Sequence, residues 1–176
     1  LFLCLSVSLQ AQENASKKAA DYVNPLIGTQ GMGHTFPGAC VPFGIVQLSP
    51  DTDTIPHNVN GAYQKEAYAY CAGYQYKDPT IVGFSHTHLS GTGHSDLGDI
   101  LLMPAVGEVQ LNPGRATVPE EGYRSRFNHD SEKARAGYYE VMLEDYAIKA
   151  QLTATQRVGV HQYTFPKERG NGHLVI

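Results

Sequence analysis

Short apolar runs, each closed by turn-forming residues, are the feature that most restricts how this 176-residue chain can fold. In the clearest run, residues 148–154, apolar side chains alternate with polar ones such as Lys149 and Gln151. A period of two predicts a β-strand with one buried face and one face in water. The apolar positions change parity after Val160, which predicts a bulge or a turn near Gly159.

Four further segments have the same character, because Pro, Gly, Asn or Asp bounds each of them. They are residues 41–49, 79–86, 99–111 and 137–145. Helical signals are scarce: residues 131–136 could form a single turn, capped by Asp130 or Ser131. Strands that follow one another without long helices between them predict an all-β fold, an antiparallel β-sandwich.

The composition limits the class of partner. The formal net charge is −4, and Lys and Arg are scattered without a basic stripe, so nucleic acid is not an expected partner. Eighteen glycines, ten prolines and eleven tyrosines, with no tryptophan, indicate many turns and tyrosine-rich strands. The length suits one domain with a sizeable core.

The N-terminal end predicts export. Residues 1–9 are apolar, and a polar run begins at Gln12, which is typical of the second half of a secretory signal. The apolar stretch is too short to cross a bilayer. A buried N-terminal strand is the alternative, and a lipid anchor on Cys4 is a weaker one because bulky residues precede it.

The C-terminal end stops at Ile176, inside an apolar run of β type. A domain rarely ends within a strand, because the partners of that strand would be left uncovered. We therefore expect a piece of a longer polypeptide. Residues 1–20 would be a truncated signal peptide with a polar leader, and residues 21–176 a β-sandwich domain that is truncated at its C-terminus.

Two cysteines, Cys40 and Cys71, lie outside the leader. An oxidising compartment would permit a disulfide between them. Two buried thiols are the favoured alternative, since unpaired cysteine is among the most buried residue types.

The first glycine-rich stretch, GTQGMGHTFPGA, covers residues 28–39. Its spacing reverses that of a dinucleotide loop, and the residues behind it cannot open a helix. Without a helix N-terminus no row of N–H groups holds a pyrophosphate, which excludes a nucleotide loop. The glycines instead predict that the backbone approaches a ligand closely or folds under His34.

The second glycine-rich stretch, residues 83–99, reads GFSHTHLSGTGHSDLGD. A nucleophile elbow does not fit this segment. Ser85 follows Gly83 in the required spacing, but Thr87 stands where the elbow needs its second glycine.

A metal site is a stronger hypothesis for the same segment. His86 and His88 are two residues apart, so on a strand they would project from one face. His94, Asp96 and Asp99 follow within reach, and such sets can hold zinc. The alternative is that the imidazoles bind loop backbone and make a turn rigid.

Recognition of a polyol is the favoured hypothesis. Neutral imidazole carries one donor and one acceptor, as do the hydroxyl groups of Thr87, Ser90 and Thr92, and sugars present both kinds of partner. Four tyrosines that could stack on a sugar lie nearby in sequence: Tyr68, Tyr70, Tyr74 and Tyr76. For any single tyrosine, however, burial in the core is the favoured interpretation.

Three long segments resemble glycoside hydrolase family 92, the calcium-dependent exo-acting α-mannosidases of bacteria. They are DYVNPLIGTQGMGHTFPGACVPFGIVQLSPDT, YCAGYQYKDPTIVGFSHTHLSGTGHSDLGDILLMP and GYYEVMLEDYAIKAQLTATQRVGVHQYTFP. The resemblance implies a supersandwich-like N-terminal domain followed by a larger (α/α)₆ barrel. That barrel would carry the general acid, the general base and the main calcium ligands, so no catalytic residue is expected in these 176 residues.

The resemblance also implies the activity of the parent protein. It would hydrolyse mannosidic linkages of glycans, N-glycans among them, with inversion: a carboxylic acid protonates the leaving oxygen while a carboxylate activates water. Calcium would bind sugar hydroxyls. The partners would be mannose-containing glycans and the C-terminal barrel of the same polypeptide, in the periplasm, outside the cell or on its surface. This chain alone would be inactive.

The sandwich would complete the sugar pocket at the domain interface. The positions carried over from the resemblance are Gly31, Gly33, His34 and Tyr68. Many members have a Trp-Asp pair where this sequence has Tyr68 and Ala69, which predicts altered ring stacking and a lost hydrogen bond.

His86 and His88 are expected to fix the loops beside that pocket. Two other functions remain open for the chain. A free-standing carbohydrate-binding module would need an aromatic platform, and the absence of tryptophan argues against it. The other is a metal-binding or structural exported domain.

Overall fold

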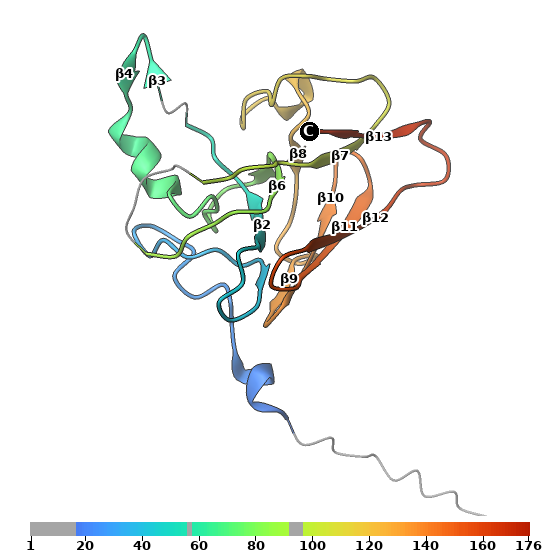
Figure 1. Cartoon of the computed structure of the whole chain (residues 1–176). Coiled ribbons are helices and arrows are strands. Elements are labelled where there is room, and N and C mark those ends of the chain that lie inside the picture. Colours follow the sequence, from blue (N-terminus) through green and yellow to red (C-terminus); the bar gives the residue numbers. More distant parts are fainter. Residues whose placement is uncertain (1–16, 56–57, 92–96) are drawn as a thin grey trace, which may run out of the picture.

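The larger of two stacked sheets is built from the C-terminal half of the chain (Figure 1). The computed structural model describes residues 17–55, 58–91 and 97–176. The strands of this sheet run antiparallel in the order β12-β11-β10-β9. They are β9 (Lys133–Arg135), β10 (Tyr138–Leu143), β11 (Ile148–Ala154) and β12 (Gly159–Thr164).

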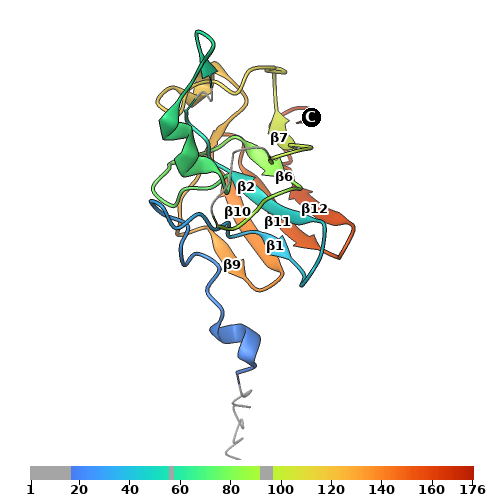
Figure 2. The ribbon, with the colours of Figure 1, turned by 60° about the vertical axis from the view of Figure 1, so that its left-hand side comes forward.

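The smaller sheet consists of β1 (Ala39–Cys40), β2 (Gln47–Asp51) and β6 (Gly83–Ser85), again antiparallel. It lies across the face of β10 and β11 (Figure 2). The core fills the space between the sheets, where Leu48 meets alternate residues of β11 such as Ile148 and Leu152. The predicted all-β fold, an antiparallel β-sandwich, is confirmed.

Shorter elements surround the two sheets. Three two-stranded pairs are β3 (Asn58–Val59) with β4 (Ala62–Tyr63), β5 (Thr80–Ile81) with β8 (Ser125–Arg126), and β7 (Met103–Val106) with β13 (Gly172–Val175). The 3₁₀ helices are η1 (Ala19–Tyr22), η2 (Lys65–Tyr70) and η3 (Pro119–Glu121). Within the described ranges, no helix has the length and apolar character needed to cross a membrane.

The strand predicted at residues 148–154 is confirmed, with buried apolar residues alternating along β11. The predicted turn near Gly159 is confirmed as well, because residues 155–158 connect β11 to β12 in a tight hairpin. Thr155 stabilises that hairpin: its N–H donates to the Val158 carbonyl at 2.9 Å, and its hydroxyl accepts the Val158 N–H at 3.1 Å.

Two predicted strands are shorter than expected because the backbone turns inside them. In residues 41–49 the strand begins at Gln47, after a turn in which Phe43 has a φ of 58°. In residues 99–111 it is confined to β7, after Ile100 at a φ of 56°. Neither Phe nor Ile favours positive φ, so the local sequence does not announce these turns.

The predicted helical turn at residues 131–136 is wrong. Residues 133–135 form β9, which pairs with β10, and Ser131 lies in the turn before it. The reason is tertiary: the side chain of Glu132 points into the core, and its carboxyl group accepts hydrogen bonds from Tyr74 and Tyr139 at 2.9 and 2.7 Å.

The Glu132 carboxyl group connects the segment after η2, the turn before β9 and strand β10. His129 lies 2.6 Å from the second Glu132 oxygen, and its other ring nitrogen lies 2.7 Å from the Tyr76 carbonyl. The pKa of Tyr139 is raised well above its ordinary value, first by burial and then by Glu132, so its hydroxyl stays protonated as a donor. These hydrogen bonds attach the segment after η2, which contains Tyr74 and Tyr76, to β10 and to the turn before β9.

Replacement of Glu132 by Ala is expected to lower the free energy of unfolding by about 3 kcal/mol, because two buried tyrosine hydroxyls lose their acceptor. The midpoint of urea unfolding measures the change. Glu108→Ala is the matched control, since Glu108 is exposed and its loss should stay within about 0.5 kcal/mol. Equal midpoints for the two variants would contradict the assigned role.

Candidate functional site

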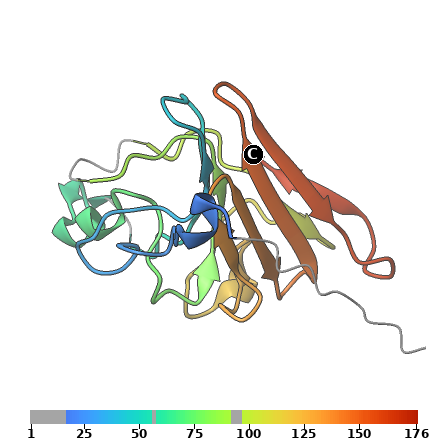
Figure 3. The ribbon, with the colours of Figure 1, turned by 90° about the horizontal axis from the view of Figure 1, so that it is seen from below.

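The loops that carry the predicted site lie together at one side of the sandwich. Seen from below, η2 and the loop of residues 28–38 lie on the side opposite to β12 (Figure 3). Gln75 links them: the Gly31 N–H donates to its side-chain oxygen at 2.9 Å, and its amide nitrogen donates to the Gly31 carbonyl at 3.0 Å. The loop of residues 28–38 and the segment of η2 and Gln75 are therefore joined, and together they are called the loop unit.

Glycine is required at position 33 because the backbone folds back on itself. A Cβ atom built there would lie 2.1 Å from the Gly28 carbonyl oxygen. Gly31 differs: its φ is 63°, but a Cβ would meet nothing within 4 Å. The close approach expected of these glycines is thus made to the chain's own backbone at Gly33, while Gly31 is exposed.

His34 is buried at the centre of this unit with a φ of 51°. Its Nδ1 lies 2.9 Å from the Cys71 sulfur, and its ring meets the edge of Tyr68 with centroids 4.8 Å apart. The Cys71 thiol donates to the Gly91 carbonyl at 3.6 Å, so the sulfur can accept from Nδ1–H. Nε2 then carries a lone pair, and no other described residue gives it a hydrogen bond.

Two of the four tyrosines singled out in the sequence, Tyr68 and Tyr70, lie on the 3₁₀ helix η2. Tyr70 and Tyr74 are buried, as predicted for tyrosines of the core, whereas Tyr68 is half-buried against His34. Cys71 is the buried thiol that the sequence predicted, but Cys40 is exposed.

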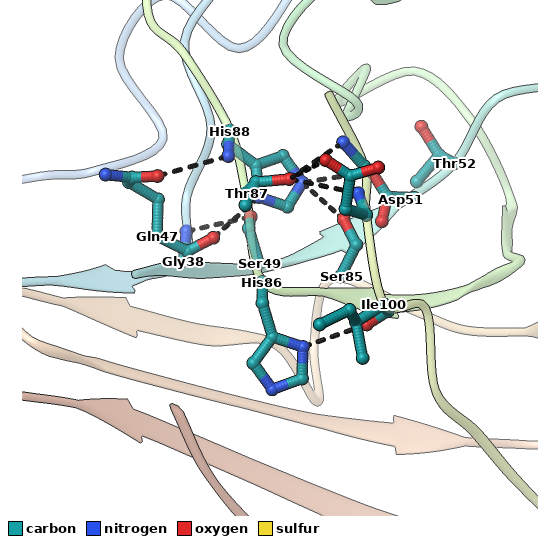
Figure 4. Close-up of polar contacts among 12 residues, drawn as sticks. Gly38, Gln47, Ser49, Asp51, Thr52, Ser85, His86, Thr87, His88 and Ile100 are labelled. Carbon is teal, nitrogen blue, oxygen red and sulfur yellow. Dashed lines mark hydrogen bonds and ion pairs between the residues drawn. The ribbon is translucent and has the colours of Figure 1, made fainter. Parts of the chain in front are cut away.

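His88 forms a buried ion pair with Asp51 (Figure 4). Its Nδ1 donates to the Gln47 carbonyl at 2.7 Å, and its Nε2 lies 3.0 Å from an Asp51 carboxylate oxygen. Both partners accept, so both ring nitrogens carry protons. Burial lowers the pKa of His88, but the Asp51 charge, the hydrogen bond to Asp51 and the Gln47 carbonyl together raise it above its ordinary value.

The pair leaves no room for a side chain at position 73. A Cβ on Gly73 would lie 2.2 Å from the Asp51 oxygen and 2.9 Å from the His88 ring, and the φ of Gly73 is 81°. The Gly73 carbonyl also accepts the Thr52 N–H at 2.9 Å. The loop after η2 therefore lies directly on the ion pair.

Ser85 does not act as a nucleophile in this arrangement. Its hydroxyl lies 3.2 Å from His88 Nε2, the same nitrogen that binds Asp51. In a catalytic triad the serine and the aspartate bind opposite ring nitrogens. Here the opposite nitrogen belongs to the Gln47 carbonyl, in agreement with the exclusion made from the sequence.

The prediction that His86 and His88 share one face is wrong, because β6 ends at Ser85. Figure 4 shows the two rings pointing in different directions. His86 Nδ1 lies 2.8 Å from the Ile100 carbonyl, and its Nε2 lies 3.1 Å from His161 Nε2 on β12. His86 therefore faces the larger sheet, away from the loops around His34.

The predicted metal set is not assembled as expected. His94 and Asp96 lie outside the described residues, and His86 points away from His88. Within the part of the chain that the structure describes, no three His, Cys, Asp or Glu side chains form a group that could hold a metal ion. The prediction that imidazoles bind loop backbone is confirmed for both rings, through Ile100 and Gln47.

A cavity of about 1030 Å³ adjoins the ion pair. Its polar walls include Asp51, Tyr70, Cys71, Asp78, His88 and Arg124. Asp51 and Asp78 each have one buried carboxylate oxygen without a hydrogen-bond partner among the described residues, and burial raises the pKa of Asp78. These oxygens are acceptors that a hydroxyl-rich ligand or water could satisfy.

Residues 22–176 match the glycosyl hydrolase family 92 N-terminal domain. The chain belongs to glycosyl hydrolase family 92. A secreted glycosidase of Arthroderma benhamiae, itself uncharacterized, is 30% identical over 158 residues, which is 88% of this chain and 19% of that protein. The family assignment made from the sequence segments is confirmed.

Solved structures of family 92 enzymes share the fold. The α-mannosidase BT3965 of Bacteroides thetaiotaomicron, solved in complex with mannoimidazole, is 47% identical with a TM-score of 0.76, over 85% of this chain and 18% of that one. The family 92 hydrolase CcMan5 is 30% identical with a TM-score of 0.67, over 88% and 20%. The inverting mannosidase BT2199 of the same Bacteroides is 25% identical with a TM-score of 0.61, over 90% and 20%. The chain thus spans about a fifth of these relatives.

Sequence reasoning missed the residues that position the site. Asp51 and Gln75 were not singled out, because each acts on a loop far away in sequence: Asp51 pairs with His88 37 residues later, and Gln75 bonds Gly31 44 residues earlier. The one available signal for Asp51 was an acidic residue at the end of an apolar run.

Replacement of His88 by Gln is expected to cost about 3–5 kcal/mol of unfolding free energy, because Asp51 would stay buried without a cation. The folded pKa of His88 is raised, so the pair stabilises fully below the unfolded pKa of about 6.5, and this stabilisation is lost as pH rises through the folded pKa. The urea midpoint of the wild type should fall as the pH rises from 5.5 to 9. The midpoint of His88→Gln should lack this part of the pH dependence. An unaltered pH profile in His88→Gln, with His173→Gln as control, would refute the pairing.

Proposed function

We propose that this chain is the N-terminal β-sandwich of a secreted exo-α-mannosidase and that it forms one wall of the sugar pocket. The observation that carries the proposal is the 47% identity to an α-mannosidase whose structure holds mannoimidazole. The chain spans only 18% of that protein. We assign the catalytic acids to the remainder of the polypeptide, as the family resemblance implies.

The wall is formed by the loop unit around His34. His34 is buried beneath this wall and packs against Tyr68, which is half-buried and would supply an aromatic surface to a sugar ring. Gly33 lets the loop fold back on the Gly28 backbone, and Gly31 leaves the exposed part of the loop without a side chain. Tyr68 and Ala69, in place of the Trp-Asp pair of many members, make the stacking surface smaller and remove a carboxylate.

The reaction is hydrolysis with inversion, as the name of the mannosidase BT2199 states for that relative. One carboxylic acid protonates the leaving oxygen and one carboxylate activates water, at a separation of about 6.5–9.5 Å. Residues of this chain orient the sugar and exclude water. Calcium, when bound to sugar hydroxyls, would help distort the ring. Its ligands are assigned to the rest of the polypeptide, as the family resemblance implies.

The location follows from the leader. Residues 1–16 lie outside the described residues, and their apolar run supports export to the periplasm, the medium or the cell surface. The relative from Arthroderma benhamiae is named a secreted glycosidase. The partners are mannose-containing glycans, N-glycans among them, and the C-terminal barrel of the same polypeptide.

Tyr68→Ala in the full-length polypeptide is expected to lower kcat/KM for α-mannosides about 10- to 100-fold, because a contact beside the reacting sugar is lost. Release of mannose measures the change, and urea unfolding checks that the fold is kept. Tyr22→Ala is the control, since Tyr22 is an exposed aromatic residue on η1. Full activity of Tyr68→Ala would remove this residue from the pocket.

The 176-residue chain alone is expected to release no mannose from an α-mannoside, whereas the full-length polypeptide does so. The physical reason is that the acid and base lie outside it. A glycan array separates this proposal from the alternative of a free-standing carbohydrate-binding module. Turnover by the chain alone would overturn the proposal, and tight glycan binding without the barrel would favour the module.

A further inference from the structure

His86 and His161 form a pair that the sugar pocket does not use. His86 follows β6 and His161 lies on β12, 75 residues later, on the side of the sandwich away from η2. Their Nε2 atoms are 3.1 Å apart and their ring centroids 4.9 Å apart, with the planes tilted by 45°. Two imidazoles from separate sheets thus direct the same ring nitrogen at a common point.

The opposite nitrogen of each ring is already held. His86 Nδ1 must donate to the Ile100 carbonyl, which lies 2.8 Å away and can only accept. His161 Nδ1 lies 2.6 Å from the Tyr163 hydroxyl, which can donate or accept. Histidines that bind metals typically donate their other ring N–H to a carbonyl or a similar partner, which fixes the ring and its tautomer.

Two backbone features support the pair at a cost to the fold. Ile100 is β-branched and two-thirds exposed, yet it has a φ of 56°, which presents its carbonyl to His86. This conformation is strained, and its own side chain gains no burial in return. On β12, a Cβ at position 159 would lie 2.7 Å from the His86 ring, so the glycine there leaves room for the ring.

We propose that His86 and His161 bind one divalent transition-metal ion, with zinc as the reference, through their two Nε2 atoms. Two tetrahedral ligands at about 2.0–2.1 Å from zinc stand about 3.3 Å apart, close to the 3.1 Å seen here. Water or another donor completes the coordination. Imidazole suits zinc, copper and nickel, whereas calcium takes oxygen ligands, so the site is distinct from a calcium site.

Metal binding replaces a direct hydrogen bond between the rings. Without metal, Tyr163 donates to His161 Nδ1, and His161 Nε2–H donates to His86 Nε2. With metal, the His161 proton moves to Nδ1 and is donated to the Tyr163 oxygen, which leaves both Nε2 lone pairs for the ion. The hydroxyl of Tyr163 permits both tautomers, and the ion would join the segment after β6 to β12.

The test is a zinc titration by calorimetry on the full-length polypeptide without a histidine tag, with calcium in excess. The wild type should bind one zinc ion more than His86→Gln or His161→Gln. Tyr163→Phe keeps the ring but loses the oxygen, so it should keep that zinc ion with about 10- to 100-fold weaker affinity. His173→Gln is the control histidine and should match the wild type.

Equal zinc stoichiometry and affinity in the wild type, His86→Gln and His161→Gln would overturn the proposal and leave the pair as a hydrogen bond. Urea unfolding reports whether each variant is folded. Should neither histidine variant fold, Tyr163→Phe decides: zinc affinity unchanged from the wild type in the folded variant refutes the site. Mannosidase activity is not the readout, so failure here is distinguishable from failure of the proposed function.

Discussion

The buried ion pair of Asp51 and His88 is the interaction on which the candidate site depends. It joins the end of β2 to the segment after β6, and the loop at Gly73 lies directly on it. Each charged group would be costly to bury alone, so the two segments must come together for either to be stable. His34 is held next to this region by the contact of its ring with Cys71 and by the hydrogen bond from the Gly91 N–H to the His34 carbonyl.

Two histidines separated by one residue have different tasks because the strand ends before them. His88 turns inward to Asp51 and serves the loop unit, whereas His86 meets His161 on the edge strand of the larger sheet. The glycine-rich segment therefore connects both sides of the molecule. Glycines at positions 73 and 159 leave the space that the two rings occupy.

Side chains of the candidate site include buried polar atoms without a partner among the described residues. His34 Nε2 and Asp51 Oδ2 are buried, and no described residue gives either atom a hydrogen bond. Buried polar atoms are rarely left in this state, so a sugar, a water molecule or the remainder of the polypeptide is expected to complete them. In the proposed function, the described loops would recognise the sugar and shape the pocket, and the reacting carboxylates would come from the rest of the polypeptide.

The sequence by itself determined what depends on neighbouring residues. The alternation along residues 148–154 predicted β11, and the change of parity predicted a bulge or a turn near Gly159. The scarcity of helical patterns predicted an all-β sandwich. The quoted segments also predicted the family. These features are readable because the period of a strand and the chemistry of a turn are local properties.

Only the tertiary structure decided which side chains meet. Residues 131–136 lack a strand pattern, yet they include β9 because buried tyrosine hydroxyls hold Glu132. His86 and His88 looked equivalent, and their directions depend on partners 75 and 37 residues away. The physical reason is that a buried charge or hydrogen bond is stabilised by whichever group the packed sheets bring beside it, and the spacing of residues along the chain does not encode that neighbour.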